Sequence, residues 1–196
     1  MIPRRLVFAT ANPGKVGELR ALVSAWGSVE VLPLAGVILP EERDTSYEDN
    51  ALSKARAVAA ATGLPALGDD SGLEVEALGG GPGIRSARWA ATDADRIAKL
   101  LDALADASPC GRRVRFRCVV ALAWPDGRAV TAEGSCAGNI ARVPRGTAGF
   151  GYDPIFVADE LGCTFAEAPV AEKDRVSHRS RAVRALGALL AHDRGP

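Results

Sequence analysis

The hydrophobic and polar positions of this chain follow two periods, which predict alternating strands and helices. An apolar run predicts a buried strand at residues 5–10, and a short alternation of apolar and polar residues predicts another at 28–32. Between these runs apolar residues recur every three or four positions, which predicts an amphipathic helix over residues 14–26. Its apolar positions are Val16, Leu19, Leu22, Val23 and Trp26.

The rest of the chain continues the alternation. The clearest helix signal spans residues 45–63, where Ser46 and Asp49 resemble a capping box and Gly63 closes the end. Two short strands around a tight turn are expected at 65–78, a helix at 93–106, and a long hairpin with a Pro-Asp-Gly turn at 114–140. A glycine-broken loop then enters a strand after residue 149. The last expected element is a helix capped by Ser177, with an apolar face of Val183, Leu186, Leu189 and Leu190. This order predicts an α/β fold with a mixed sheet, in a single domain over residues 1–196 without a separable linker.

Composition narrows the class of protein. The formal net charge is +0, so no overall basic field would attract nucleic acid. The four cysteines form no C-x-x-C pair, which favours reduced core thiols in a cytosolic protein over a zinc site. The first ten residues have too short an apolar run for a signal peptide, and no stretch approaches the length of a membrane span. A cytoplasmic protein is therefore expected.

The stretch "FATANPGKV" places a small-residue turn and Lys15 between the first strand and the first helix. It is not a Walker A loop, because Ala9 and Val16 stand where that loop needs a glycine and a hydroxyl. The turn still offers the side chains of Thr10 and Asn12, backbone N–H groups and one cation, which together suit a phosphate. A plain strand-to-helix turn with a solvated lysine is the alternative.

Three later stretches carry further candidate chemistry. "GDDSG" places Asp69, Asp70 and Ser71 at an expected strand end, where one carboxylate could bind a hard cation or activate water while the other fixes the turn. Here an ordinary Asp-rich turn is the alternative. "GFGYDPIF" offers an aromatic that could stack on a base or fill the core. "EKDRVSHRSRA" places His178 and Arg179 at a helix start, where they could bind an anion or a base edge. A capped surface helix with scattered charges is the alternative.

The order of these motifs resembles the inosine triphosphate pyrophosphatase family, the Ham1-like enzymes. The family pattern runs T-x-N-x-x-K, an acidic residue before an E-N-A-x-x-K-A helix, D-D-S-G-L with P-G-x-x-S-A-R, G-F-G-Y-D-P-x-F, and S-H-R. The likeness spans nearly the whole chain. The helix motif reads "EDNALSKA", with Asp49 in place of the usual glutamate.

The resemblance implies an elongated, two-lobed fold with the active cleft between the lobes, and a homodimer. It implies hydrolysis of non-standard purine nucleoside triphosphates such as ITP, dITP and XTP to the monophosphate and pyrophosphate, with Mg²⁺ or Mn²⁺ as the cofactor. Asp70 would be the general base and a metal ligand, and Glu42 the second carboxylate near the metal. Substrate would be held on the phosphate side by Thr10, Asn12, Lys15 and Ser71, on the base-side wall by Phe150, Gly151, Tyr152 and Asp153, and on the opposite side of the cleft by Lys173, His178 and Arg179.

Two other functions stay open from the sequence. A Maf-like nucleotide pyrophosphatase would share the fold but begin with a different serine- and arginine-bearing motif. A nucleotide-binding protein without catalysis would keep Lys15 but would not need Asp70 and Glu42 together.

Overall fold

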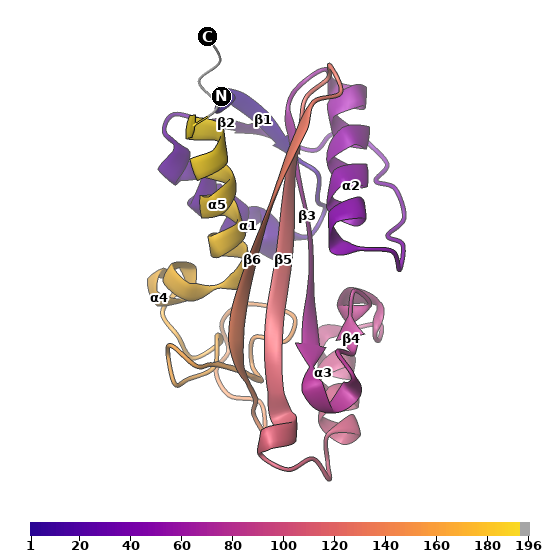
Figure 1. Cartoon of the computed structure of the whole chain (residues 1–196), viewed down its shortest axis with the longest axis vertical. Helices are drawn as coiled ribbons and strands as arrows, with labels where there is room; N and C mark the ends of the chain where they lie inside the picture. The colour runs from indigo at the N-terminus through magenta and orange to yellow at the C-terminus, as the bar shows by residue number, and fades with distance from the viewer. Residues whose placement is uncertain (193–196) are drawn as a thin grey trace. The chain divides into compact units, whose positions relative to one another are not determined.

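The computed structural model describes residues 1–192 of the chain (Figure 1). The helices within these residues are α1 (Pro13–Val23), α2 (Tyr47–Thr62), α3 (Asp93–Ala103), α4 (Val170–Val176) and α5 (His178–His192). The strands are β1 (Arg5–Phe8), β2 (Glu30–Leu32), β3 (Ala66–Val75), β4 (Pro82–Gly83), β5 (Arg113–Ala123), β6 (Ala129–Ile140) and β7 (Phe156–Ala158).

The chain divides into two compact units, and each is assembled from separate stretches of sequence. The first unit comprises Met1–Asp70, Cys118–Gly134 and the C-terminal segment that begins at His178. The second comprises Ser71–Arg117 and Ser135–Ser177. The strands β3, β5 and β6 contribute residues to both units. The chain therefore passes from one unit to the other four times.

The sheet is mixed, as the sequence predicts. In the first unit the strand order is β2-β1-β3-β5-β6, and β1 runs parallel to both β2 and β3. In the second unit β4 pairs antiparallel with β3, and β7 pairs antiparallel with β6.

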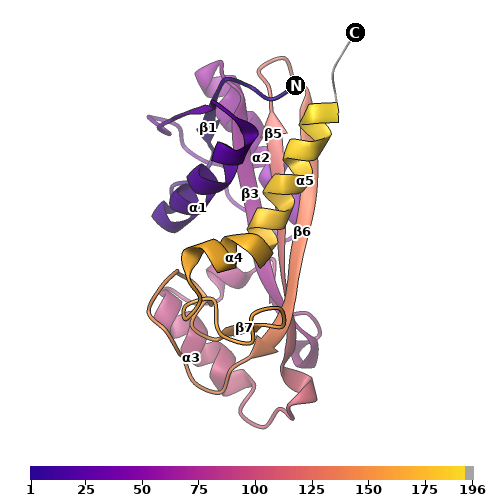
Figure 2. The ribbon, with the colours of Figure 1, turned by 90° about the vertical axis from the view of Figure 1, so that its left-hand side faces the viewer.

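Helices cover both faces of the sheet in the first unit. The helices α1 and α5 lie side by side on one face, and α2 covers the other (Figures 1 and 2). Leu67 of β3 belongs to the hydrophobic cluster that includes residues of α1 and α5, whereas Gly68 faces α2. Because neighbouring strand residues point to opposite faces, Asp69 and Asp70 continue this alternation toward the two helical layers.

Two glycines allow helices to approach this sheet closely. A Cβ on Gly68 would lie 2.5 Å from the backbone oxygen of Ala51 in α2. A Cβ on Gly134 of β6 would lie 2.3 Å from the backbone oxygen of His178 at the start of α5. Both distances are shorter than any real Cβ contact, so the missing side chains set how near α2 and α5 lie to the strands.

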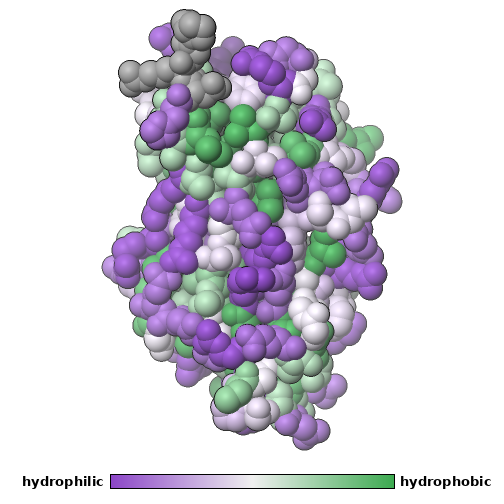
Figure 3. Space-filling model, viewed as in Figure 1, coloured by the Kyte–Doolittle hydropathy of each residue, from purple (hydrophilic) through white to green (hydrophobic). Residues whose placement is uncertain are grey.

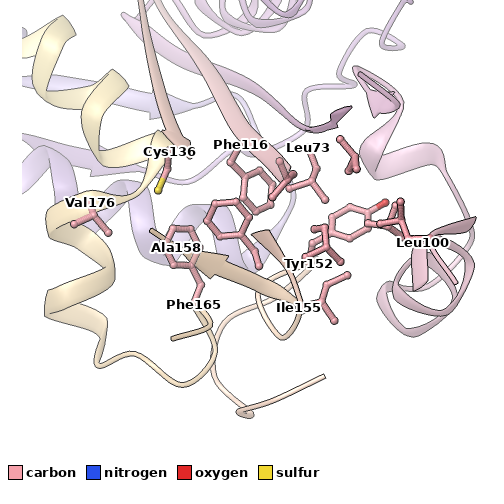
Figure 4. Packing of buried hydrophobic residues seen from close by; sticks show 14 residues of the cluster. Leu73, Leu100, Phe116, Cys136, Tyr152, Ile155, Ala158, Phe165 and Val176 are labelled. Carbon is pink, nitrogen blue, oxygen red and sulfur yellow. The ribbon is translucent and has the colours of Figure 1, made fainter. Parts of the chain in front are cut away.

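The second unit has a hydrophobic core of its own, built around aromatic rings. The ring centroids of Phe116 and Phe156 lie 4.8 Å apart, and those of Phe156 and Phe165 lie 4.7 Å apart. Figure 4 shows the ring of Tyr152 in the same cluster, close to Ile155. The loop that carries Tyr152 is thus anchored in the core.

Several predicted elements are confirmed. Ser46 accepts a hydrogen bond from the backbone N–H of Asp49 at 2.9 Å, and Gly63 ends α2 with a φ of 67°. The hairpin appears as β5 and β6, and the loop that follows enters β7. The first predicted helix ends earlier than expected, at Val23, and a 3-10 turn covers Ser24–Trp26.

Other expectations are wrong. Residues 66–75 form one continuous strand rather than two short strands around a turn. The charges of Asp69 and Asp70, which favoured a turn, are balanced by residues distant in sequence. The helix α4 was not expected, and Leu189 of α5 is 49% exposed rather than buried. Of the four free thiols, Cys118 and Cys136 are buried, but Cys110 is exposed and is not a core residue.

The surface mixes polar and apolar residues. On the face shown in Figure 3 the hydrophobic residues form separate groups among hydrophilic ones. Within residues 1–192 no helix is both long and apolar enough to cross a membrane.

Candidate active site

The start of α1 is built by side chains of the turn itself. Asn12 caps the helix, because its Oδ1 accepts hydrogen bonds from the backbone N–H groups of Gly14 and Lys15 at 2.9 and 3.2 Å. The hydroxyl of Thr10 accepts the backbone N–H of Asn12 at 3.2 Å. The two side chains that were expected to meet a phosphate therefore use their oxygens to fix the shape of the turn, which places Lys15 in the first turn of α1.

Asp69 points from β3 toward α1 and α5 and meets a cation from each. Its Oδ2 lies 3.0 Å from Nζ of Lys15 and accepts Nε and Nη2 of Arg179 at 3.3 and 3.2 Å. A third residue joins them, because Nη1 of Arg179 donates to the carboxylate of Glu18 on α1. The side chain of Asp69 is 1% exposed, so these cations replace water as the partners of Oδ2, whereas Oδ1 is buried and accepts no hydrogen bond from residues 1–192.

Asp70 points the other way, toward α2. Its Oδ2 accepts Nδ2 of Asn50 at 2.8 Å. The same amide group bonds the backbone N–H and C=O of Arg43, each at 2.8 Å. Asn50 thus joins the central strand to the loop that carries Glu42.

Glu42 and Lys54 complete this side of the site. Nζ of Lys54, also on α2, lies 2.6 Å from Oε1 of Glu42. Burial lowers the pKa of Lys54, but the nearby charges of Asp69 and Glu42 more than offset this and raise it above its usual value. Lys54 therefore remains a cation among the carboxylates.

The two neighbouring aspartates differ in electrostatics as well as in direction. Burial alone would raise the pKa of Asp69, but the charges of Lys15 and Arg179 hold it well below its usual range. Burial raises the pKa of Asp70 to about 6, because the charge of Lys54 opposes the rise only in part and that of Glu42 adds to it. Asp69 is thus a fixed anion, and Asp70 is the more basic carboxylate.

A divalent cation would fit beside Asp70 and Glu42. Among residues 1–192 no three His, Cys, Asp or Glu side chains are grouped as a complete metal site. Magnesium, however, needs only one or two carboxylates, with water and substrate phosphates as its other ligands. The burial of Asp70 and its repulsion by Glu42 both raise its pKa, and a cation held by these carboxylates would relieve that cost.

The second unit holds another group of predicted residues. Oδ2 of Asp153 lies 2.6 Å from Nζ of Lys173 and accepts the backbone N–H of Phe150 at 3.0 Å. The ammonium of Lys173 also lies 5.4 Å from the centre of the Phe150 ring. The structure therefore brings Lys173 against Asp153 and Phe150, rather than to the opposite side as expected.

The remaining residues of the glycine-rich loop have clear positions. The hydroxyl of Tyr152 donates to the backbone oxygen of Ser86 at 3.0 Å, and the residue is 4% exposed. The backbone N–H of Gly151 donates to Asp93 of α3 at 2.7 Å. Phe150 is only partly buried, so Phe150 rather than Tyr152 is the aromatic of this loop that a ligand could reach.

Of three further predicted binding residues, His178 and Arg179 are buried and Ser71 is only partly buried. His178 and Arg179, the first residues of α5, are 4% and 3% exposed. Ser71 follows Asp70 on β3 and is partly buried.

Sequence reasoning missed several residues that organise these groups. Asn50 and Lys54 were recognised only as part of a motif, although the first bonds Asp70 and the second pairs with Glu42. Glu18 and Asp93 gave no signal beyond helical spacing, since Glu18 lies three residues after Lys15 and Asp93 opens a helix. Their partners are distant in sequence, so only the fold reveals them.

The fold and the site define a class: a mixed α/β protein whose central strand carries two buried aspartates among lysines, a set of groups suited to phosphates and a divalent cation. Within that class the chain belongs to the Ham1 family, whose model matches residues 6–189.

Individual relatives are similar over nearly their whole length. A dITP/XTP pyrophosphatase of Thermus thermophilus is 50% identical, over 98% of this chain and 93% of the relative. A dITP/XTP pyrophosphatase of Rhodospirillum centenum is 47% identical, over 94% of this chain and 96% of the relative. The solved structure of a HAM1 protein from Coxiella burnetii superposes with a TM-score of 0.85 at 40% identity, covering 97% of this chain and 100% of that one.

Proposed function

We propose that this chain is a nucleoside triphosphate pyrophosphohydrolase for non-standard purine nucleotides such as dITP and XTP. It would convert them to the monophosphate and pyrophosphate before they enter DNA or RNA. The full-length likeness to relatives named dITP/XTP pyrophosphatase supports the substrate class. One structural observation carries the chemistry: a buried, basic Asp70 lies among Glu42, Lys54 and Lys15.

Asp70 would accept a proton from the attacking water. Its pKa of about 6 makes it a stronger base than an ordinary aspartate, yet it remains mostly ionised at neutral pH. The hydrogen bond from Asn50 fixes the direction of its carboxylate. The water attacks the α-phosphorus and the bond to the β-phosphate oxygen breaks, which releases pyrophosphate.

Asp70 and Glu42 would hold the divalent cation, which we propose to be Mg²⁺ with Mn²⁺ as a substitute. When bound, the ion neutralises charge on the phosphates and lowers the pKa of a bound water. Lys54 already neutralises Glu42 at 2.6 Å. It would therefore have to share or release that carboxylate when the metal binds.

Lys15 would bind the triphosphate, assisted by the turn of Thr10 and Asn12 and by Ser71. An ammonium group has three N–H donors, and the contact with Asp69 occupies one of them. Two donors remain for phosphate oxygens. The side chain is 16% exposed, so a ligand can reach it.

Phe150 would stack on the base, beside the Asp153–Lys173 pair. Inosine and xanthosine carry a 6-oxo acceptor where adenosine carries a 6-amino donor. A site that presents only donors there would leave the adenine amino group unpaired, and a mismatch of that kind can discriminate by about 10⁴-fold. Lys173 supplies such a donor close to the Phe150 ring. Rejection of guanine would have to come from its 2-amino group.

We further propose that the enzyme acts on free nucleotides in the cytoplasm as a homodimer and binds neither nucleic acid nor membranes. The family resemblance supports the dimer, and the formal net charge of +0 supports the absence of a nucleic-acid partner. Sedimentation at micromolar concentration would measure the oligomeric state.

The test is pyrophosphate release by the EDTA-treated chain, with and without added Mg²⁺, from dITP, XTP, dGTP, dATP and dTTP. We expect Mg²⁺-dependent pyrophosphate release from dITP and XTP, with the monophosphate as the second product. Asp70→Asn should lose this activity. The control Asp126→Asn, in the exposed turn between β5 and β6, should keep it.

The outcomes separate the candidate functions. Preference for dTTP would favour a Maf-like enzyme. Binding of nucleotides without pyrophosphate release would indicate a non-catalytic protein. Full turnover in EDTA would exclude the metal-assisted mechanism.

A further inference from the structure

Four charged residues of the first unit form three ion pairs in a row, and the helix α1, which carries both end residues, closes the row into a ring. Lys15 and Arg179 both contact Oδ2 of Asp69, and Arg179 also donates to Glu18. Lys15 and Glu18 lie three residues apart on α1, so their side chains share one face of that helix. The ring therefore joins α1 to β3 and α5, and it meets α1 at two points.

The fork of Arg179 divides its hydrogen bonds between the two carboxylates. Nε and Nη2 donate to Asp69, and Nη1 donates to Glu18. The guanidinium is 3% exposed, and the side chains of Glu18 and Lys15 are each 16% exposed. The charges of the ring sum to zero, as buried ions require.

This division matters to Lys15. As long as Glu18 holds Nη1, the guanidinium keeps a fixed orientation and leaves part of Asp69 Oδ2 to Lys15. If Glu18 loses its charge, Arg179 keeps only one charged partner in the ring, and its fork can turn so that it donates to both oxygens of Asp69, because Oδ1 is buried and accepts no hydrogen bond from the part of the chain that the structure describes. Such a turn would take a donor away from Oδ2 and rotate the Asp69 carboxylate, so the oxygen that now fixes the Lys15 ammonium at 3.0 Å would move.

We infer that Glu18 is a positioning residue, which holds Lys15 in place for the triphosphate through Arg179 and Asp69. The inference rests on the proposed function, in which Lys15 binds phosphate. Glu18 does not itself touch substrate. Its contribution to catalysis should therefore exist only while Lys15 is present.

A merely structural role for Glu18 would give a different result. Loss of folding stability reduces the fraction of active enzyme, so kcat falls, KM stays constant and the effect is the same whichever residue is at position 15. A positioning role couples the two residues, and a double-mutant cycle measures that coupling.

The experiment compares the wild type, Glu18→Gln, Lys15→Met and the double variant, with kcat and KM for dITP measured well below each melting temperature. We expect Glu18→Gln to lower kcat/KM roughly tenfold in the wild-type background and less than about twofold in the Lys15→Met background. Glu18→Asp, which keeps the charge, should recover part of the loss. The control Glu30→Gln breaks an exposed ion pair with Arg5 in the same unit and should change neither constant.

Equal fold losses in both backgrounds would overturn the inference while leaving the proposed function intact. So would wild-type kinetics in Glu18→Gln. If the wild type itself releases no pyrophosphate from dITP, the proposed function fails and this inference fails with it. If Glu18→Gln does not fold at the assay temperature, Glu18→Asp takes its place in the cycle, and a loss that persists unchanged without Lys15 again refutes the coupling.

Discussion

The substitution Asp70→Asn should abolish activity and at the same time stabilise the metal-free protein. Asp70 is 3% exposed, and its pKa rises from an ordinary 3.8 to about 6. A rise of that size means that burying the ionised carboxylate costs about 3 kcal/mol at neutral pH. An uncharged asparagine of nearly the same shape avoids this cost.

Part of this gain in folding stability is offset by a hydrogen-bond mismatch in the variant. The side-chain oxygen of an asparagine can still accept the N–H of Asn50, but its amide group would face the ammonium of Lys54 without a good acceptor. We assign about 1 kcal/mol to that mismatch. The net gain is then about 2 kcal/mol, or roughly 4–8 °C in melting temperature for a chain of this size.

The gain in stability from Asp70→Asn should increase with pH. Because the pKa of Asp70 is raised on folding, its protonated form stabilises the folded state at low pH, and this contribution is lost as the pH rises through about 6. The difference between the variant and the wild type should be small at pH 4 and complete at pH 7.5. Added Mg²⁺ should stabilise only the wild type and so reduce the difference in melting temperature between the two proteins.

The assay is a pair of thermal melts in EDTA at pH 4 and pH 7.5, together with dITP turnover in Mg²⁺. Asp126→Asn, an exposed aspartate whose pKa is instead lowered by its hydrogen bonds to Arg128, serves as the control. A variant that melts at or below the wild-type temperature at pH 7.5 would refute the argument from burial. A variant that keeps its turnover would refute the assigned role of Asp70 as the base.

The neighbouring substitution Asp69→Asn should have the opposite effect on stability, a loss of about 3–5 kcal/mol in denaturant melts, because it leaves the buried guanidinium of Arg179 without one of its charged partners. Lys15→Ala should keep the fold but lower kcat/KM on the order of 10²-fold, and a value within about threefold of wild type would return this lysine to a surface role. A thiol reagent at pH 8 should modify Cys110 rapidly in the native protein and Cys118 only after unfolding, because burial raises the pKa of Cys118 to about 12; mass spectrometry of the labelled protein measures both.

Local signals were enough to predict much of the fold. The capping serine and closing glycine of α2 act within a few residues of each other, so the sequence shows both ends of that helix. The same holds for the turn between β5 and β6, where a Pro-Asp-Gly run interrupts two long strand patterns. Such elements depend little on the rest of the chain.

The prediction failed where distant residues decide the structure. Asp69, Asp70 and Ser71 resemble a turn because charged and small residues disfavour a strand interior, yet they lie within β3. Arg179, 110 residues away, and Asn50 supply the partners that make the strand possible. Local rules are broken most often at functional sites, which agrees with the role that we propose for Asp70 on this strand.

The short helix α4 was not predicted from the sequence, for a related reason. Its seven residues carry no side-chain cap and little apolar periodicity. What fixes one of them is the contact of Lys173 with Asp153, 20 residues earlier in the chain. The same contact places Lys173 against the glycine-rich loop and not away from it as expected, and no signal near position 173 in the sequence reveals the pairing.

The interleaved course of the chain has a consequence for biosynthesis. Asp69 leaves the ribosome long before Arg179, and at 5–20 residues per second the interval is about 5–20 s. During that time the first unit lacks α5, and Asp69 lacks one of the two cations that neutralise it when buried. The first unit therefore cannot complete its folding until α5 has left the ribosome. A premature stop between α4 and α5 would leave the second unit's segments complete and the first unit without its last helix.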